Sequence, residues 1–308
     1  MKPRCPVLLM GLLSLIFGCG GSDSPYRQKD GQWYFKNDLM PLQKGETLTP
    51  LSRTFAKSNR AAYYESSTIA DDIDVATFAA LSDHWAKDKR SVWYCDTYRK
   101  GQEYYTAKHY RTPRIAGVDA PSFRMLDPNY ARDTNRIYSD GRGFEVRDIN
   151  SYERIGDVHA KDKISGYYMT AEIMGSDGST FAFLDGHYSK DANHVFWSNF
   201  DSGKGAHAPV EVSVTLPGAD PQTFVIIKDN YAGDTNQVYY AAKVISRARA
   251  SFRVLENDYA VTDKAVFFRG DILKGADVAS FVVLTEPVAG VTARDKNGQF
   301  NYEKRVQQ

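Results

Sequence analysis

Apolar residues occur along this chain in short runs, bounded by Asp, Asn, Lys or Gly, and the same succession recurs many times. The clearest copy spans residues 220–240, DPQTFVIIKDNYAGDTNQVYY. Its first half reads Asp-x-x-Ser/Thr-Phe/Tyr-x-x-Leu/Ile, and its second half reads Tyr-Ala-x-Asp-x-Asn-x-Val-Tyr-Tyr. Apolar and aromatic runs this short, separated by turn residues, predict strands rather than helices.

The unit repeats through most of the chain with a period of about 29 residues. Copies of the second half begin at Tyr26, Phe55, Trp85, Tyr130, His159, Tyr188, Tyr231 and Tyr259, and a degenerate copy begins at Thr292. Copies of the first half cover residues 74–81, 119–126, 148–155, 177–184, 220–227 and 277–284, and residues 248–255 keep the pattern without its Asp. Such a period is typical of repeat proteins, whose units bury their apolar faces against one another.

Each unit can be interpreted physically, with residues 220–240 as the example. A single capped turn is expected first, because Asp220 can accept backbone N–H groups and Pro221 suits a first helical position. Strands are then predicted over residues 224–227, over residues 231–233, and from residue 238 onward, with an Asp- and Asn-containing turn before the last of them.

The predicted fold is therefore all-β: tandem repeats, each a short three-stranded antiparallel meander, stacked as an open solenoid. A parallel α/β arrangement needs helical segments of about 10–15 residues between its strands, and the period leaves no room for them. The alternative is a closed β-propeller, since eight or nine such units could form a ring. Propeller blades usually have four strands and about 40 residues, which favours the open stack. The repeat domain covers residues 26–302, and residues 303–308 form a tail.

Two intervals between copies are longer, 45 residues from Trp85 to Tyr130 and 43 residues from Tyr188 to Tyr231. Both insertions lie between the Tyr-Tyr strand and the next Asp turn, so they should project from one face, which is often the binding face. The first insertion, residues 95–118, carries the candidate binding residues Tyr98, Tyr104, Tyr105, His109 and Tyr110. Tyr-rich, cationic loops suit recognition surfaces. An additional structural hairpin is the alternative interpretation.

Residues 1–18 have the pattern of a bacterial lipoprotein export signal. Lys2 and Arg4 precede an apolar run that is too short to span a bilayer. The run ends in Ile-Phe-Gly-Cys, which resembles a lipobox, so Cys19 is the predicted lipidation site. Residues 19–25 predict a flexible tether. We expect a body held to the cell envelope by acyl chains on Cys19, at the periplasmic face of the outer membrane. An ordinary secretory signal is the alternative.

Net charge and cysteine content limit the classes of partner and of thiol chemistry that we expect. Lys2 and Arg4 account for two of the 39 basic residues, so the mature chain has 37 against 38 acidic residues. A near-neutral balance argues against a nucleic-acid partner, because phosphate neutralisation needs a basic face. With Cys5 in the signal and Cys19 lipidated, Cys95 alone remains. It follows a predicted strand and is interpreted as a packing residue rather than a reactive thiol.

The repeated second half resembles the DKNYY family of bacterial proteins, named for an Asp-Lys-Asn-x-x-Tyr-Tyr motif. The motif stands here as Asp88-Lys89-Arg90-Ser91-Val92-Trp93-Tyr94, as Asp234-Thr235-Asn236-Gln237-Val238-Tyr239-Tyr240, and in decayed form as Asp295-Lys296-Asn297. The resemblance covers roughly residues 26–302. It implies a secreted or lipid-anchored repeat protein, and it implies no catalytic residue.

We find no known catalytic, nucleotide-binding or metal-binding motif in the sequence. The Asp-x-Asn segments at Asp133, Asp191 and Asp234 lack the several converging oxygen ligands of a calcium loop and are interpreted as hairpin turns. We expect no catalytic residue, no metal site and no cofactor. The favoured hypothesis is a lipid-anchored, non-enzymatic envelope protein that binds a protein or glycan through one face of the array. The alternatives are an envelope hydrolase acting on glycans, which needs only two facing carboxylates, and an immunity or inhibitor-type protein.

Overall fold

The computed structural model describes residues 24–43, 45–201, 210–288 and 290–306. These residues form two compact units. The first contains the described residues up to Thr134 together with Asp140–Arg142, and the second contains Asn135–Ser139 and the described residues from Gly143 onward. None of the helical segments in these ranges has the length and apolar character needed to cross a bilayer.

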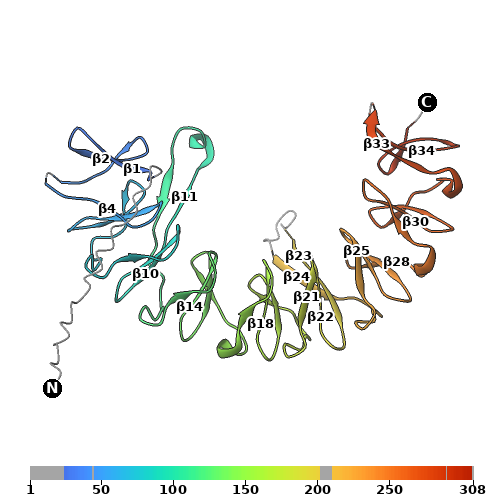
Figure 1. The fold of residues 1–308 in the computed structure, drawn as a ribbon, viewed down its shortest axis with the longest axis horizontal. Coiled ribbons are helices and arrows are strands. Elements are labelled where there is room, and N and C mark those ends of the chain that lie inside the picture. The colour runs from blue at the N-terminus through green and yellow to red at the C-terminus, as the bar shows by residue number, and fades with distance from the viewer. Residues whose placement is uncertain (1–23, 44, 202–209, 289, 307–308) are drawn as a thin grey trace, which may run out of the picture. The chain divides into compact units, whose positions relative to one another are not determined.

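Small antiparallel sheets follow one another along the chain, so the all-β prediction is confirmed (Figure 1). The first unit contains the sheets β1–β3 (Tyr26–Lys29, Gln32–Phe35, Asp38–Leu39), β4–β7 (Thr49–Pro50, Phe55–Lys57, Ala62–Tyr64, Ser67–Thr68) and β8–β10 (Ala79–Ala80, Trp85–Lys87, Val92–Tyr94), and the hairpin β11–β12 (Asp96–Tyr98, His109–Arg111). The division between the units falls within the sheet β13–β16 (Arg124–Met125, Tyr130–Arg132, Ile137–Ser139, Arg142–Phe144).

The second unit continues with five further sheets among its described residues. They are β17–β20 (Glu153–Arg154, His159–Lys161, Gly166–Tyr168, Ala171–Glu172), β21–β24 (Ala182–Asp185, Tyr188–Lys190, Val195–Asp201, Val210–Thr215), β25–β28 (Val225–Lys228, Tyr231–Gly233, Val238–Tyr240, Lys243–Ser246), β29–β32 (Arg253–Val254, Tyr259–Val261, Val266–Phe268, Asp271–Ile272) and β33–β36 (Val282–Val288, Val291–Asp295, Gly298–Asn301, Lys304–Arg305). Single 3-10 turns among the described residues are η1 (Gly101–Glu103) in the first unit and η2 (Ile149–Ser151), η3 (Arg249–Ser251) and η4 (Val278–Ser280) in the second.

The β17–β20 repeat shows how one unit is built from its residues. Asp148 caps the turn η2, where its side chain accepts the backbone N–H groups of Asn150 and Ser151 at 2.9 and 3.1 Å. The turn leads into β17, which pairs with β18, and β18 pairs with β19. The capped single turn and the antiparallel meander are thus as the sequence predicted.

A fourth strand closes this repeat, and the sequence pattern did not reveal it. The chain leaves β19 through Met169 (φ 52°) and returns as β20, and then Ile173 donates its backbone N–H to the carbonyl of Gly166 at 2.8 Å. Four strands fit within about 29 residues because most are only two to four residues long. The prediction of three strands in each repeat was therefore wrong. Because this repeat has four strands, as a propeller blade does, the number of strands does not favour an open stack over a propeller.

Apolar cores lie between successive repeats, as expected for a repeat protein. One cluster joins Tyr231 and Val238 of the β25–β28 repeat to Phe252, Ala260 and Phe267 of the next repeat. The second residue of the second half-motif is small and fully buried in every copy after the first, at Ala56, Ala86, Ala131, Ala160, Ser189, Ala232, Ala260 and Ala293. A small residue is needed here because aromatic rings of the preceding repeat pack against it.

Polar bonds from each repeat to the next supplement these cores within each unit. The hydroxyl of Tyr188 donates to the carbonyl of Asn230 at 2.7 Å, and that of Tyr231 donates to the carbonyl of Asp258 at 2.8 Å. Lys57 donates to the carbonyls of Val75 at 3.1 Å and of Phe78 in the following repeat. Side chains that recur in the motif therefore link neighbouring repeats.

Candidate functional site

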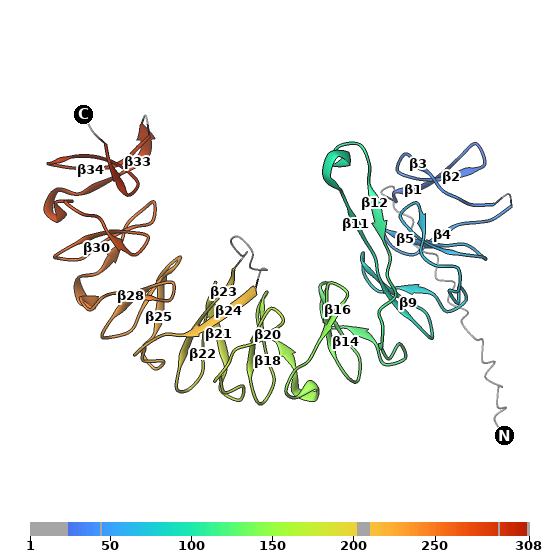
Figure 2. The same cartoon turned by 180° about the vertical axis from the view of Figure 1, so that it is seen from behind.

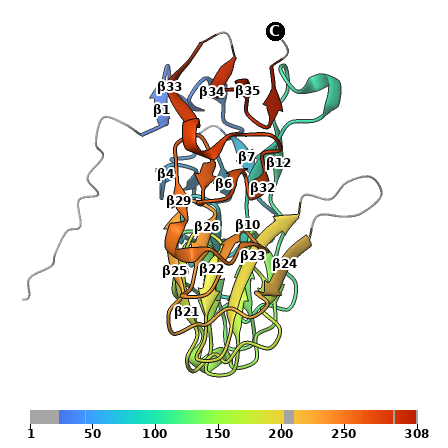
Figure 3. The same cartoon turned by 90° about the vertical axis from the view of Figure 1, so that its right-hand side faces the viewer.

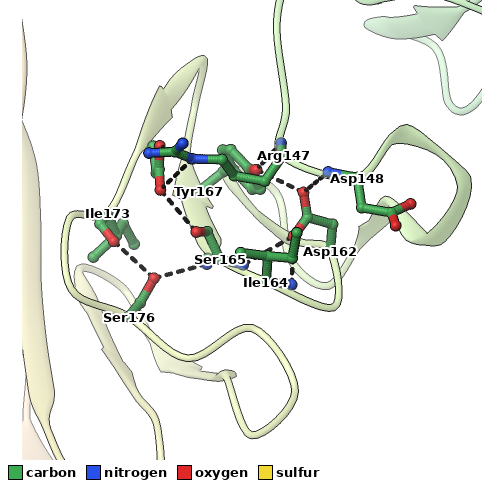
Figure 4. A network of polar contacts seen from close by, with 10 residues as sticks. Arg147, Asp148, Asp162, Ile164, Ser165, Tyr167, Ile173 and Ser176 are labelled. Carbon is green, nitrogen blue, oxygen red and sulfur yellow. Dashed lines mark hydrogen bonds and ion pairs between the residues drawn. The ribbon is translucent and has the colours of Figure 1, made fainter.

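The recurring Asp of the second half-motif is a buried structural carboxylate, as Asp162 illustrates (Figure 4). Its Oδ1 accepts the backbone N–H groups of Ile164 and Ser165 at 2.7 and 2.9 Å, and its Oδ2 accepts the N–H of Asp148 and the hydroxyl of Tyr167, both at 2.7 Å. Burial alone would raise the pKa of Asp162, but these hydrogen bonds outweigh burial and lower the pKa. The carboxylate therefore ties the hairpin turn to the capped turn fourteen residues earlier.

The same link recurs along the chain. The bonds from a capping residue's N–H to the buried carboxylate join Asp74 to Asp88, Asp119 to Asp133, Asp148 to Asp162, Asp177 to Asp191, Asp220 to Asp234 and Asp277 to Asp295, at 2.7 to 3.0 Å. In the β29–β32 repeat both partners are replaced, by Ala248 and Thr262. Thr262 accepts only the local N–H groups of Lys264 and Ala265, and Ala248 donates to Ser246 instead. The repeat that lacks the recurring Asp of the second half-motif thus also lacks the capping Asp of the first half-motif.

The hydroxyl residues of the first half-motif have an equally structural role. Each side-chain hydroxyl accepts the backbone N–H of the residue that follows the recurring Asp or its replacement. The accepting residues are Thr77, Ser122, Ser151, Thr180, Thr223, Ser251 and Ser280. The Lys of the motif forms an ion pair with the capping Asp, for example Lys89 with Asp74 at 2.7 Å and Lys296 with Asp277 at 2.9 Å. The hydroxyl, Lys and Asp side chains of the motif therefore hold its two turns together.

The first insertion forms the hairpin β11–β12, which projects beyond the strands β9 and β10 of its own unit (Figure 2). Tyr110 anchors its base: the hydroxyl lies 2.8 Å from Ser66 Oγ, and the ring packs against Tyr64. Thr112 donates to the carbonyl of Ile69 at 3.2 Å. Arg114 returns the chain to β10, pairing with Trp93 and forming an ion pair with Asp72. Tyr110, one of the predicted binding residues, thus attaches the base of the hairpin to the β4–β7 repeat.

Lys108 strengthens this base. Its Nζ lies 2.5 Å from Glu65 Oε2 and 5.1 Å from the centre of the Tyr110 ring. Burial favours the neutral amine, but hydrogen bonds to Glu65 and Tyr110 outweigh burial and raise the pKa of Lys108. Lys108 is therefore a charged, half-buried link between the hairpin and the β4–β7 repeat.

The tip of the hairpin carries the other predicted binding residues, and the structure brings them together. Tyr98 stacks on His109 at 5.2 Å, and His109 Nε2 lies 2.9 Å from Glu103 Oε2. Tyr104 and Tyr105 form an edge-to-face pair at 5.1 Å. Tyr98, Tyr104 and Tyr105 remain 44%, 53% and 90% exposed. Arg99 and Lys100 are also exposed at this end. We call Tyr98, Tyr104, Tyr105, His109, Arg99 and Lys100 the aromatic tip.

The second insertion takes another form. It lengthens strands β23 and β24 of the β21–β24 repeat, whose register runs without a break from Phe196 opposite Thr215 to Asp201 opposite Val210. Leu216 still donates to the carbonyl of Val195 at 2.8 Å, as Ile173 does to Gly166. Both insertions therefore extend the connection between the third and fourth strands and leave the repeat intact.

Three further features bear on chemistry: possible metal ligands, Cys95 and a pocket beside Trp33. The described residues contain no group of three or more His, Cys, Asp and Glu side chains that could hold a metal ion. Cys95 is buried, and burial raises the pKa of its thiol, so the packing interpretation is confirmed. A pocket of about 450 Å³ beside Trp33 is lined by one carboxylate, Glu46, which pairs with Arg60 at 3.4 Å.

Comparison with known proteins adds no further assignment: no family model, no curated protein and no solved structure matches the chain. The DKNYY resemblance therefore stays a prediction based on the sequence motif. The predicted signal, residues 1–18, and the lipidation site Cys19 lie outside the described residues.

Proposed function

We propose that this protein is a non-enzymatic binding protein of the bacterial cell envelope, in which the repeats are a scaffold and the aromatic tip recognises a protein or glycan partner. One observation supports the proposal most directly. Three exposed Tyr side chains stand on a hairpin whose base is fixed by Tyr110, Lys108 and Arg114. Function is thus assigned to residues that the repeats do not share.

Physical arguments favour recognition at this tip. Tyr presents a large contact area at a small cost in conformational entropy, and Tyr and Arg are enriched among residues that dominate binding energy. Arg99 and Lys100 are exposed beside the rings, and His109 and Glu103 offer hydrogen-bonding groups. Because the base of the hairpin is held in place, less conformational entropy is lost when the tip binds a partner.

The proposed address follows from the sequence. A signal over residues 1–18 and acyl chains on Cys19 would hold the protein to a membrane, most simply the periplasmic face of the outer membrane. The tether over residues 19–25 would give the repeats freedom to meet a partner. Nucleic acid is not a proposed partner, because the mature charge is close to neutral.

Site-specific photocrosslinking in intact cells tests the proposal. A photoreactive phenylalanine analogue at Tyr105 should capture a partner, whereas the same group at Met174, which is 71% exposed on another repeat, should not. The double variant Tyr98→Ser/Tyr104→Ser, with the crosslinker kept at position 105, should lose the crosslink while the protein stays folded.

Two results would count against this function. Equal capture from positions 105 and 174 would mean that the tip has no special role. Turnover of an envelope glycan by the purified protein, with no partner captured at the tip, would instead favour the hydrolase alternative.

A further inference from the structure

Strand β24 is an open edge with few of the features that usually protect one. It is the last strand of the order β21-β22-β23-β24, so one side of it is unpaired, and Figure 3 shows it at the margin of its sheet. It is six residues long, whereas the last strands β20, β28 and β32 of neighbouring repeats have two to four. Unpaired edges of this length can pair with another chain.

The register identifies the backbone groups that face outward. Leu216 donates its N–H to Val195, so these two residues form a hydrogen-bonded pair. Bonded and non-bonded pairs alternate in an antiparallel ladder. Val214, Val212 and Val210 therefore bond to β23, and Glu211, Ser213 and Thr215 direct their N–H and C=O groups to the open edge. None of these three residues has a backbone hydrogen bond outside the ladder within the described ranges.

The side chains of β24 alternate, with Val210, Val212 and Val214 on one face. Val210 and Val214 are 50% and 37% exposed. The sequence VEVSVT contains neither Pro nor Lys, which commonly protect edges. The longer edge strand β33 differs, because it contains Glu286 and Pro287 and its register is interrupted. The final strand of the chain, β36, consists of Lys304 and Arg305.

We propose that β24 pairs with β24 of a second copy of this chain, antiparallel and about a two-fold axis at Ser213, so that two four-stranded sheets become one. In this register Ser213 lies opposite its own mate, and Glu211 lies opposite Thr215 of the other copy. These are the residues whose backbone groups face outward, so each such pair exchanges two hydrogen bonds.

The side chains fit this arrangement without conflict. Val212 lies opposite Val214 of the other copy, which places β-branched residues in contact across the new ladder. The one charged residue of the strand, Glu211, meets a neutral Thr rather than its own mate, so no like charges face each other. A self-complementary strand is what a two-fold interface requires. A second copy is therefore a better occupant than an arbitrary extended peptide, for which nothing sets the register.

Sedimentation equilibrium of the full chain in density-matched detergent tests the proposal with a matched pair of variants. Ser213→Pro removes an N–H that points only outward, and Pro is tolerated on an edge strand. Ser213→Ala removes the same hydroxyl, which lies 2.8 Å from Ser198 Oγ, and keeps the N–H. We expect a dimer for the native chain and for Ser213→Ala, and a monomer for Ser213→Pro.

Val214→Lys provides a second test that does not depend on the fold of the Pro variant. It should also give a monomer, whereas Val282→Lys, on the protected edge β33, should leave the dimer intact. A native chain that is monomeric throughout the concentration range would overturn the proposal. So would a dimer that withstands both Ser213→Pro and Val214→Lys, or a monomer that binds a foreign peptide at this edge.

Discussion

At the scale of single residues, one buried hydroxyl departs from the repeat pattern. Ser189 is fully buried, and its Oγ has no hydrogen-bond partner among the described residues, whereas the other buried residues at this position of the repeats are Ala. Ser189→Ala should stabilise the protein by about 1 kcal/mol, because burying an unpaired hydroxyl costs free energy. Urea denaturation measures the change. Ser165→Ala is the control and should destabilise, because Ser165 donates to Glu172 at 2.7 Å; stabilisation by both would contradict the argument.

His159 should make stability depend on pH. It is fully buried, it stacks on Phe183 at 4.9 Å, and neither ring nitrogen has a partner among the described residues. Burial, with smaller contributions from the nearby His187 and Arg154, lowers its pKa from 6.5 to about 4. The unfolded chain therefore binds a proton as pH falls below 6.5 and the folded chain does not, so stability is complete above pH 6.5 and is lost toward pH 4.

Urea denaturation at two pH values measures this effect. Between pH 7 and pH 5 the unfolding free energy should fall by about 2 kcal/mol through His159. His159→Phe should remove this component, since Phe55 occupies the equivalent position of another repeat. An unchanged pH dependence in His159→Phe would show that other groups cause it.

At the scale of the element, the buried Asp should matter more than any exposed polar residue of the repeat. Asp162→Ala leaves three backbone N–H groups, one of them buried and two partly buried, without an acceptor and should cost about 3 kcal/mol of stability. Asp162→Thr should cost less, because Thr262 shows that a hydroxyl can accept the two local N–H groups. Thermal unfolding ranks the variants, with the exposed Asp185→Ala as a near-neutral control. Equal losses for Thr and Ala would contradict this account.

The hairpin β11–β12 should divide into a structural base and a free tip. Tyr110→Ala removes the contact with Tyr64 and the hydrogen bond with Ser66 and should cost about 2–3 kcal/mol. Tyr105→Ala, at a 90% exposed position, should change stability by no more than about 0.5 kcal/mol. Thermal unfolding distinguishes them, and similar effects of the two substitutions would contradict the division.

Local pattern predicted much of each element. Strands β26 (Tyr231–Gly233) and β27 (Val238–Tyr240) begin where the sequence placed them, and Asp148 and Asp277 cap their turns as expected. The fourth strand could not be predicted, because its turn uses positive φ at residues such as Met169 and Ala241, which have no such preference. Strands of two residues also leave no periodic signal.

The candidate site was predicted in composition but not in arrangement. Tyr98, Tyr104, Tyr105 and His109 do gather at one tip, because a hairpin brings its two strands together. The contact of Tyr110 with Ser66 could not be predicted, since Ser66 lies 44 residues away in sequence and only tertiary structure brings the two together. The unprotected edge of β24 was missed for a similar reason: which strand lies last in a sheet is a property of pairing, not of composition.

At the scale of the whole molecule, the repeat motif is a device for joining units. Tyr188, Tyr231 and Tyr259 each donate forward into the next repeat, and the last copy has Thr292 where the others have an aromatic ring or His. Thr292 Oγ1 lies 2.8 Å from the hydroxyl oxygen of Tyr259, and Thr292 is buried within the final sheet. The forward link therefore ends at the terminal repeat, consistent with atypical end units in repeat proteins.

The proposed address is also a property of the whole molecule and depends on Cys19. Metabolic labelling with a radioactive fatty acid should mark the native protein and Cys5→Ala, because Cys5 lies in the predicted signal. Cys19→Ala should carry no label and should be released from membranes by alkaline extraction, because no acyl chain would then hold the body. A labelled Cys19→Ala protein would overturn the assignment of the lipid site. A native protein that is unlabelled but exported would favour the ordinary secretory signal instead, and the aromatic tip would then act from a freely diffusing protein.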